Sequence, residues 1–304
     1  MKLSRAFVAI PHFFDRSGVA DTRHDSADPA SAARRAQALS TVIARLQELF
    51  GQPALVADHK NGRTREVALG GRMEIDISVI TNGDNHLVDQ LTCPPSLYKH
   101  VPAEGDPRWL GLSAHKAIAQ SLGRYDWHCY LEDDTAVEDA MFFAKLRHAY
   151  DLFDAQVGTD AILQPARYET VLDAPGTALS LPHKLYPDYE CDGMPYFQAP
   201  DVSIDMLGRR WTLEPARHPH AGCFFLDQRR AEIFARSKYC GEQVELWVTP
   251  PDTTATWSIL NTFRLYKATL DCFDFLEVRH LRPSMIRQLR AVDGAYTWRK
   301  ARPS

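Results

Sequence analysis

The sequence has no apolar stretch of the length that a membrane-spanning helix needs, and it has no excess of positive charge. It contains 35 Lys and Arg residues and 39 Asp and Glu residues. The resulting formal net charge of −4 argues against a general nucleic-acid-binding protein. The six cysteines include no Cys-x-x-Cys pair, which argues against a zinc ribbon or a dithiol redox site. No signal-peptide cleavage pattern follows the apolar run in Met1–Phe14. We therefore expect a cytoplasmic protein with reduced thiols.

The first half of the chain alternates between strand and helix patterns. Apolar runs and period-two alternation predict strands at Ala6–Ile10, Ala54–Ala57, Glu74–Ile80, Trp127–Leu131 and Ala161–Leu163. Apolar residues at helical spacing predict helices between Leu39 and Phe50, at Leu112–Leu122 and at Ala140–Phe153. This order predicts an α/β fold with a mainly parallel, twisted sheet flanked by helices.

The second half shows less periodicity. Leu172–Pro219 is rich in Pro, Tyr and Asp and is expected to form long binding loops, as is Cys93–Trp109 in the first half. Regular structure is predicted again in Gly222–Leu226 (strand), Thr253–Phe263 (helix) and Phe275–Val278 (strand). We expect two halves, residues 1–165 and 166–304, closely joined as a single domain.

Polar clusters follow three of the predicted strands: Pro11-His12, Asn82-Gly83-Asp84 and Glu132-Asp133-Asp134. Open sheets of this kind bind ligands at the carboxyl ends of their strands. Residues two apart in an extended chain point the same way, so Glu132 and Asp134 are expected to share a face. Such close carboxylates repel each other unless protons or a cation intervene, and Mg²⁺ or Mn²⁺ suits these oxygen ligands. The alternative is an acidic strand end that merely faces water.

Leu112–Asp134 contains a helix, a turn with Gly123 and Tyr125, an apolar strand and the acidic cluster. This segment resembles the region around the Asp-x-Asp motif of GT-A glycosyltransferases, including family-2-like members. Phe7–Phe14 is similar to their first nucleotide-binding strand. The similarity covers the first half well and the second half loosely, and the cluster here is Glu-Asp-Asp rather than Asp-x-Asp.

The resemblance implies that Asp134 binds Mn²⁺ or Mg²⁺, with Glu132 and His280 as further ligands. It also implies a nucleotide-sugar donor, with a UDP-sugar as the expected one. The residues expected to contact this donor are Pro11, His12, Asp84, His115, Lys116, Glu132, Asp133, Arg279 and Arg282. For the two arginines, the expected partner is the diphosphate, through bidentate contacts.

An inverting transferase also needs a general base. The resembling enzymes place a catalytic Asp at the start of a helix in this part of the chain, which points to Asp252. Asp252 also fits a helix N-cap, and Pro251 stands where these enzymes usually have Glu. Glu242 and Glu245 therefore remain alternative candidates.

The expected function is transfer of a sugar to a hydroxyl of a glycan or glycolipid, of the bacterial surface type. One alternative is a nucleotidyltransferase of similar fold, although such enzymes usually carry a Gly- and Arg-rich loop after the first strand and residues 15–31 contain a single glycine, Gly18. Another is a non-catalytic nucleotide-sugar-binding module. Arg279–Ser304 holds seven Lys or Arg and one acid, Asp293, which predicts peripheral contact with the inner face of a membrane.

Overall fold

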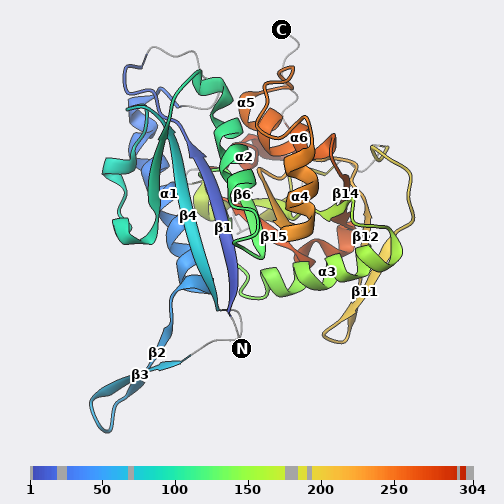
Figure 1. Cartoon of the computed structure of the whole chain (residues 1–304), viewed down its shortest axis with the longest axis horizontal. Helices are drawn as coiled ribbons and strands as arrows, with labels where there is room; N and C mark the ends of the chain where they lie inside the picture. The colour runs from blue at the N-terminus through green and yellow to red at the C-terminus, as the bar shows by residue number, and fades with distance from the viewer. Residues whose placement is uncertain are drawn as a thin grey trace.

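A five-stranded sheet forms the centre of the fold (Figure 1). The computed structural model describes residues 3–18, 26–67, 72–174, 184–189, 194–292 and 295–298. In spatial order the sheet contains β13 (Cys223–Asp227), β6 (Trp127–Leu131), β1 (Ser4–His12), β4 (Met73–Asn82) and β5 (Lys99–Ala103). All neighbouring strands are parallel except β13, which is antiparallel to β6. The prediction of an α/β fold is confirmed. The strands predicted at Ala6–Ile10, Glu74–Ile80 and Trp127–Leu131 are the three central strands of the sheet.

Helices cover both faces of this sheet (Figure 1). In chain order they are α1 (Ala32–Leu46), extended by the π-helical turn η2 (Gln47–Gly51), then α2 (Leu110–Gln120), α3 (Phe142–Gln156) and α4 (Gln228–Arg236). The chain moves from β1 to β4 on one side and then returns to β6 on the other. Because crossover connections are right-handed, these opposite movements place α1 and α2 on opposite faces. The carboxyl ends of β1 and β6 therefore flank the point where the strand order reverses.

Two four-stranded sheets complete the body. One contains β10 (Lys184–Leu185), β9 (Ala166–Thr170), β15 (Glu277–His280) and β7 (Thr135–Val137). The other contains β11 (Val202–Met206), β12 (Arg209–Pro215), β14 (Arg264–Ala268) and β8 (Ala161–Leu163). Each of the three larger sheets takes strands from both sides of residue 165, so the two halves are joined through shared sheets.

Several expectations about local structure are wrong. The strand expected at Ala54–Ala57 does not enter the main sheet: β2 (Ala54–Asp58) pairs with β3 (Arg63–Val67) in a hairpin that projects from the body (Figure 1). The loop expected at Cys93–Trp109 contains β5, where Pro102 obscures the pattern but is tolerated because β5 is an edge strand. The expected loops of Leu172–Pro219 contain the hairpin of β11 and β12. The second half is therefore less irregular than its sequence indicates.

The predicted helix at Thr253–Phe263 begins earlier. It consists of α5 (Pro250–Asp252), the π-helical turn η7 (Thr253–Trp257) and α6 (Ser258–Leu260) in direct succession. A last hairpin pairs β16 (Leu289–Val292) with β17 (Ala295–Trp298). Among the described helices, none combines the length and the apolar character needed to cross a membrane.

His115 on α2 is enclosed in the core, where three aromatic rings surround it: Tyr130, Phe224 and Phe234. Its Nε2 lies 3.0 Å from the carbonyl oxygen of Thr254, and its Nδ1 lies 3.4 Å from the amide nitrogen of Gly241. Nε2–H donates to the carbonyl while Nδ1 accepts from the amide, and this pair of bonds needs a neutral imidazole. Burial lowers the pKa of His115 to about 4.

We expect His115 to make the protein sensitive to acid. The unfolded chain takes up a proton near the ordinary His pKa of 6.5, whereas the folded chain does so only near 4. The stabilisation is thus complete above pH 6.5 and declines as the pH falls to 4, by up to about 3 kcal/mol. Urea unfolding of the wild type and of His115→Gln across this range measures the effect. The stability difference between them should shrink toward low pH, and a constant difference would contradict the assignment.

Candidate functional site

Asp133 joins the carboxyl ends of β6 and β1. Nδ1 of buried His12 lies 2.6 Å from Oδ2 of Asp133, and Nη2 of Arg35 lies 3.2 Å from the same oxygen. Nε2 of His12 accepts from the backbone N–H of Leu87, so Nδ1 carries the proton that is donated to Asp133. Burial alone would raise the pKa of Asp133, but Arg35 and His12 hold it below its usual range. Asp133 is therefore an ionised carboxylate that fixes the point of strand reversal.

Asp134 is buried beside two cationic side chains. Its Oδ2 lies 3.4 Å from Nε2 of His280 and 3.5 Å from Nη1 of Arg282. The other ring nitrogen of His280 donates to Oε1 of the fully buried Glu169 at 2.9 Å. Burial would raise the pKa of Asp134, but His280 and Arg282 hold it well below its usual range. The pKa of His280 rises to about 9 because Asp134 and Glu169 outweigh its burial.

Glu132 precedes Asp133 and Asp134, and its negative charge is less well compensated by neighbouring positive charges. Burial raises its pKa to about 8, and the neighbouring carboxylates Asp134 and Asp252 add to this rise while Arg167 opposes it. A Cβ atom at Gly222 would stand only 2.6 Å from Oε2 of Glu132, and the φ angle of Gly222 is +66°. A glycine at this position thus leaves the space that the Glu132 carboxylate occupies.

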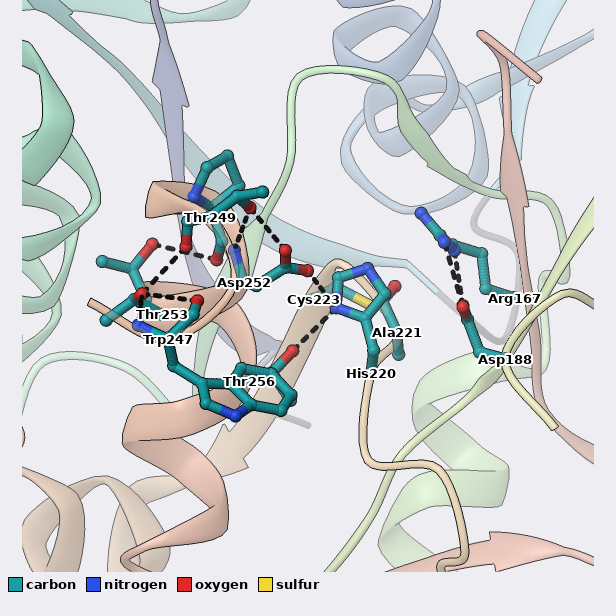
Figure 2. A network of polar contacts seen from close by, with 12 residues as sticks. Arg167, Asp188, His220, Ala221, Cys223, Trp247, Thr249, Asp252, Thr253 and Thr256 are labelled. Atoms are coloured by element: carbon teal, nitrogen blue, oxygen red, sulfur yellow. Dashed lines mark hydrogen bonds and ion pairs between the residues drawn. The ribbon is translucent and has the colours of Figure 1, made fainter. Parts of the chain in front are cut away.

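Asp252 and His220, both from the second half of the chain, face each other (Figure 2), and the charge of Asp252 contributes to the raised pKa of Glu132. Nδ1 of His220 lies 2.7 Å from Oγ1 of Thr256 and 3.4 Å from Oδ1 of Asp252. The interpretation of Asp252 as an N-cap is wrong: Thr249 is the N-cap residue, and its hydroxyl accepts from the amide of Asp252 and donates to the carboxylate. The side chain of Asp252 is held from both sides and remains partly exposed.

A buried ionic network supports the loop that carries His220 and Gly222. Nε of Arg167 on β9 lies 2.6 Å from Oδ2 of Asp188, a pair that Figure 2 shows apart from Asp252. Nζ of Lys267 on β14 donates to the backbone carbonyls of Asp188 and His220. Burial lowers the pKa of Lys267 to about 8 and the pKa of His220 to about 3. His220 is therefore neutral at physiological pH, and Arg167 supplies the positive charge nearest to Glu132 in the second half.

Other predicted residues lie elsewhere. His115 is enclosed in the core, where its ring nitrogens bond to Thr254 and Gly241, and the stem of the exposed Lys116 packs near Gly241. Neither placement supports the expected approach to a diphosphate. Aromatic side chains enclose the ring of His115, and the side chain of Lys116 is exposed. Glu242 and Glu245 are exposed in the segment before α5.

The donor-side residues of the main sheet occupy its carboxyl edge. Pro11 precedes His12 on β1, and Asp84 is exposed in the turn after β4. Arg279 is already held by Asp173, with Nε–Oδ2 at 2.8 Å, and by Glu138. The predicted basic tail includes Arg299, Lys300 and Arg302, which lie outside the described residues.

Five charged residues of the site escaped the sequence predictions: Arg35, Arg167, Glu169, Asp188 and Lys267. Arg35 lies on an otherwise regular helix, and Asp188 lies in a segment without a pattern. Lys267 carries a usable signal, since it interrupts an apolar strand in which a lysine is rarely buried unless it is paired. Glu169 has no such signal, because β9 reads Ala-Arg-Tyr-Glu-Thr and is polar at three of its five positions.

The described residues contain no preformed group of three or more His, Cys, Asp or Glu side chains that could hold a metal ion. The donor chemistry nevertheless fits a divalent cation at Asp134. Glu169 holds Nδ1 of His280, which turns Nε2 toward the carboxylate, as in the carboxylate–histidine arrangements that orient metal-binding imidazoles. A cation bound at Asp134 would replace the proton on Nε2, because metal binding and proton release are coupled.

Searches against known proteins give no assignment. No protein-family model matches this chain, and no curated protein sequence matches it.

The Arg167–Asp188 pair predicts a stability effect that is specific to a buried ion pair. Asp188→Asn leaves the Arg167 charge buried without its carboxylate and should cost about 3–5 kcal/mol of unfolding free energy. Asp205→Asn is a matched control, because Asp205 also pairs with an arginine, Arg210, but both side chains are 69% exposed. It should change stability little or not at all. Urea denaturation at neutral pH measures both, and equal effects would contradict the role of the buried pair.

Proposed function

We propose that this protein is a metal-dependent glycosyltransferase that moves a sugar from a nucleotide-sugar donor to an acceptor hydroxyl. One observation carries the proposal. Asp252 and His280, both more than 100 residues later in the sequence, meet Glu132 and Asp134 at the carboxyl end of β6: His280 lies 3.4 Å from Asp134, and both later residues affect the pKa of Glu132. This edge of a parallel sheet, at the reversal of strand order, is where open α/β sheets bind ligands.

The residues divide into a metal side and an acceptor side. Asp134 would hold Mn²⁺ or Mg²⁺, with His280 and Glu132 as further donors, and the cation would neutralise the departing nucleoside diphosphate as a Lewis acid. Asp133, through His12, holds the edge of β1 on which the donor nucleotide would lie. Arg282 carries a positive charge on the same side as Asp134.

Asp252 is the proposed general base for the acceptor hydroxyl. Asp252 is connected with the cluster through His220 and through its electrostatic effect on Glu132, whereas Glu242 and Glu245 are exposed. His220 is neutral, and together with Thr249 it orients the Asp252 carboxylate. Asp252 would accept the proton of the acceptor hydroxyl as the hydroxyl oxygen bonds to the anomeric carbon. The bond from that carbon to the diphosphate breaks, the carbon gains oxocarbenium character, and the nucleoside diphosphate departs.

We expect UDP binding to depend on a divalent cation and on Asp134. Bare diphosphate is repelled by the ionised carboxylates of Asp133 and Asp134 at the end of β6, whereas a cation bound there attracts it. Isothermal titration calorimetry of UDP with and without Mn²⁺ tests this on the wild type and on Asp134→Asn. The control is Asp76→Asn, which removes an exposed carboxylate of β4. Equal binding with and without the cation, or an unaffected Asp134→Asn variant, would refute the metal role.

Asp252→Asn should separate chemistry from binding. The variant should keep cation-dependent UDP binding but lose roughly two to four orders of magnitude in transfer rate, the usual cost of removing a general base. A screen of nucleotide-sugar donors that detects released nucleoside diphosphate supplies the assay. Glu242→Gln and Glu245→Gln are controls, since both residues are exposed outside the cluster, and should retain activity. If a control variant loses transfer while Asp252→Asn retains it, the base has been assigned to the wrong residue.

A further inference from the structure

A groove of about 840 Å³ opens beside Asp134, between α1 and the segment that follows β15. One side is formed by residues spaced four apart on a single face of α1, including Ala33, Thr41 and Arg45. The other side is formed by residues 281–284 and Arg287. Asp134 also lines the groove, so the groove and the carboxylate cluster share a boundary.

Arginines give this groove a positive character. Arg279 is neutralised by Asp173 and Glu138, and Arg282 faces Asp134. Arg34 on α1 and Arg287 on the opposite side of the groove differ from these two arginines in their charge environment. Both are exposed, and neither has a carboxylate within salt-bridge distance among the described residues. Two guanidinium groups on facing sides of one groove form a site for anions, in a chain whose net charge is −4.

The groove is longer than one diphosphate at Asp134 requires. Ala33 and Arg45 are twelve residues apart on α1, which corresponds to about 18 Å at 1.5 Å per residue. Asp133 contacts Arg35 in the first turns of this helix, so the Asp134 end of the groove lies near the amino end of α1. Arg45 lies at the far end, where Glu48 pairs with it. A ligand in the groove therefore reaches the carboxylate cluster with one end and remains outside it with the other.

We propose that this groove binds a phosphate-bearing part of the acceptor, at a site separate from the nucleotide. Anion binding by Arg34 and Arg287 does not depend on the transferase function, whereas the identification of the ligand as an acceptor rests on it. The recognised chemistry is the phosphate group, which a soluble sugar phosphate and a lipid headgroup both carry. Binding at Arg34 and Arg287 needs no divalent cation, in contrast to the binding of nucleotide at Asp134.

Calorimetry with fructose 1,6-bisphosphate, a sugar with two phosphate groups, tests the proposal. It should bind in the presence of EDTA, and it should still bind when UDP and Mn²⁺ are saturating. The variant Arg34→Glu/Arg287→Glu should weaken this binding by about tenfold or more, because each arginine supplies charge-assisted contacts. The control Arg63→Glu/Arg65→Glu makes the same change in net charge on the exposed β2–β3 hairpin and should bind as the wild type does.

A parallel experiment measures flotation of the protein with phosphatidylcholine vesicles that contain phosphatidic acid. It tests whether the groove binds a phosphate group that is carried by a lipid. Loss of either interaction in the groove variant alone supports the site. Equal binding by the groove and control variants would overturn the proposal. Displacement of the bisphosphate by UDP with Mn²⁺ would also overturn it, because the groove would then be part of the nucleotide site. If the Glu variant fails to fold, as judged by circular dichroism, Arg34→Gln/Arg287→Gln replaces it. Failure of UDP to bind would instead count against the transferase function and leave the EDTA result unaffected.

Discussion

Three consecutive carboxylates at the end of a buried strand are the constraint on which the rest of the site depends. Each enclosed negative charge needs a compensating charge or a proton, because burial penalises the ionised form. Asp133 is compensated by Arg35 and His12, and Asp134 by His280 and Arg282. Glu132 is influenced by Arg167 and His280, but burial and the neighbouring carboxylates outweigh them, and its pKa rises to about 8.

These compensating charges come from every part of the chain. His12 ends β1, Arg35 lies on α1, Arg167 on β9 and His280 on β15. The shared sheets bring these elements together: β7, which begins directly after Asp134, pairs with β15 and thereby brings His280 to the cluster. The electrostatics of one acidic triplet are thus coupled to the pairing of strands about 140 residues apart. A structural role alone would be served more simply by apolar residues, since buried ion pairs contribute little net stability.

The sequence predicted the parts of this arrangement that have a local signal. The central strands have strong apolar patterns, and the acidic triplet follows one of them directly, so β1, β4, β6 and Asp134 could be recognised. Arg167 and Asp188 could not, because each is an ordinary charged residue in the sequence and gains its role only when β9 and residue 188 meet in space. The N-cap was misassigned for a related reason. Thr249 and Asp252 both fit the cap position by residue type, and only the backbone shows that α5 begins after Thr249.

Asp133 and Asp134 lie in a turn after β6, closed by the bond from the amide of Thr135 to the carbonyl of Glu132, rather than in the extended chain expected from the sequence. Asp134 has two different neighbourhoods there. On one side lie Glu132, Asp252 and the neutral His220, a region with an excess of carboxylates that is suited to accepting protons. On the other lie His280, Arg282 and the groove along α1, where cationic groups outnumber the acids that pair with them. A transfer reaction needs both, since a leaving diphosphate must be stabilised by positive charge while an attacking hydroxyl must lose a proton to a negative one. Asp134 stands at the boundary between the two neighbourhoods, where one carboxylate contributes to both, and a cation held by it would supply positive charge to the departing diphosphate.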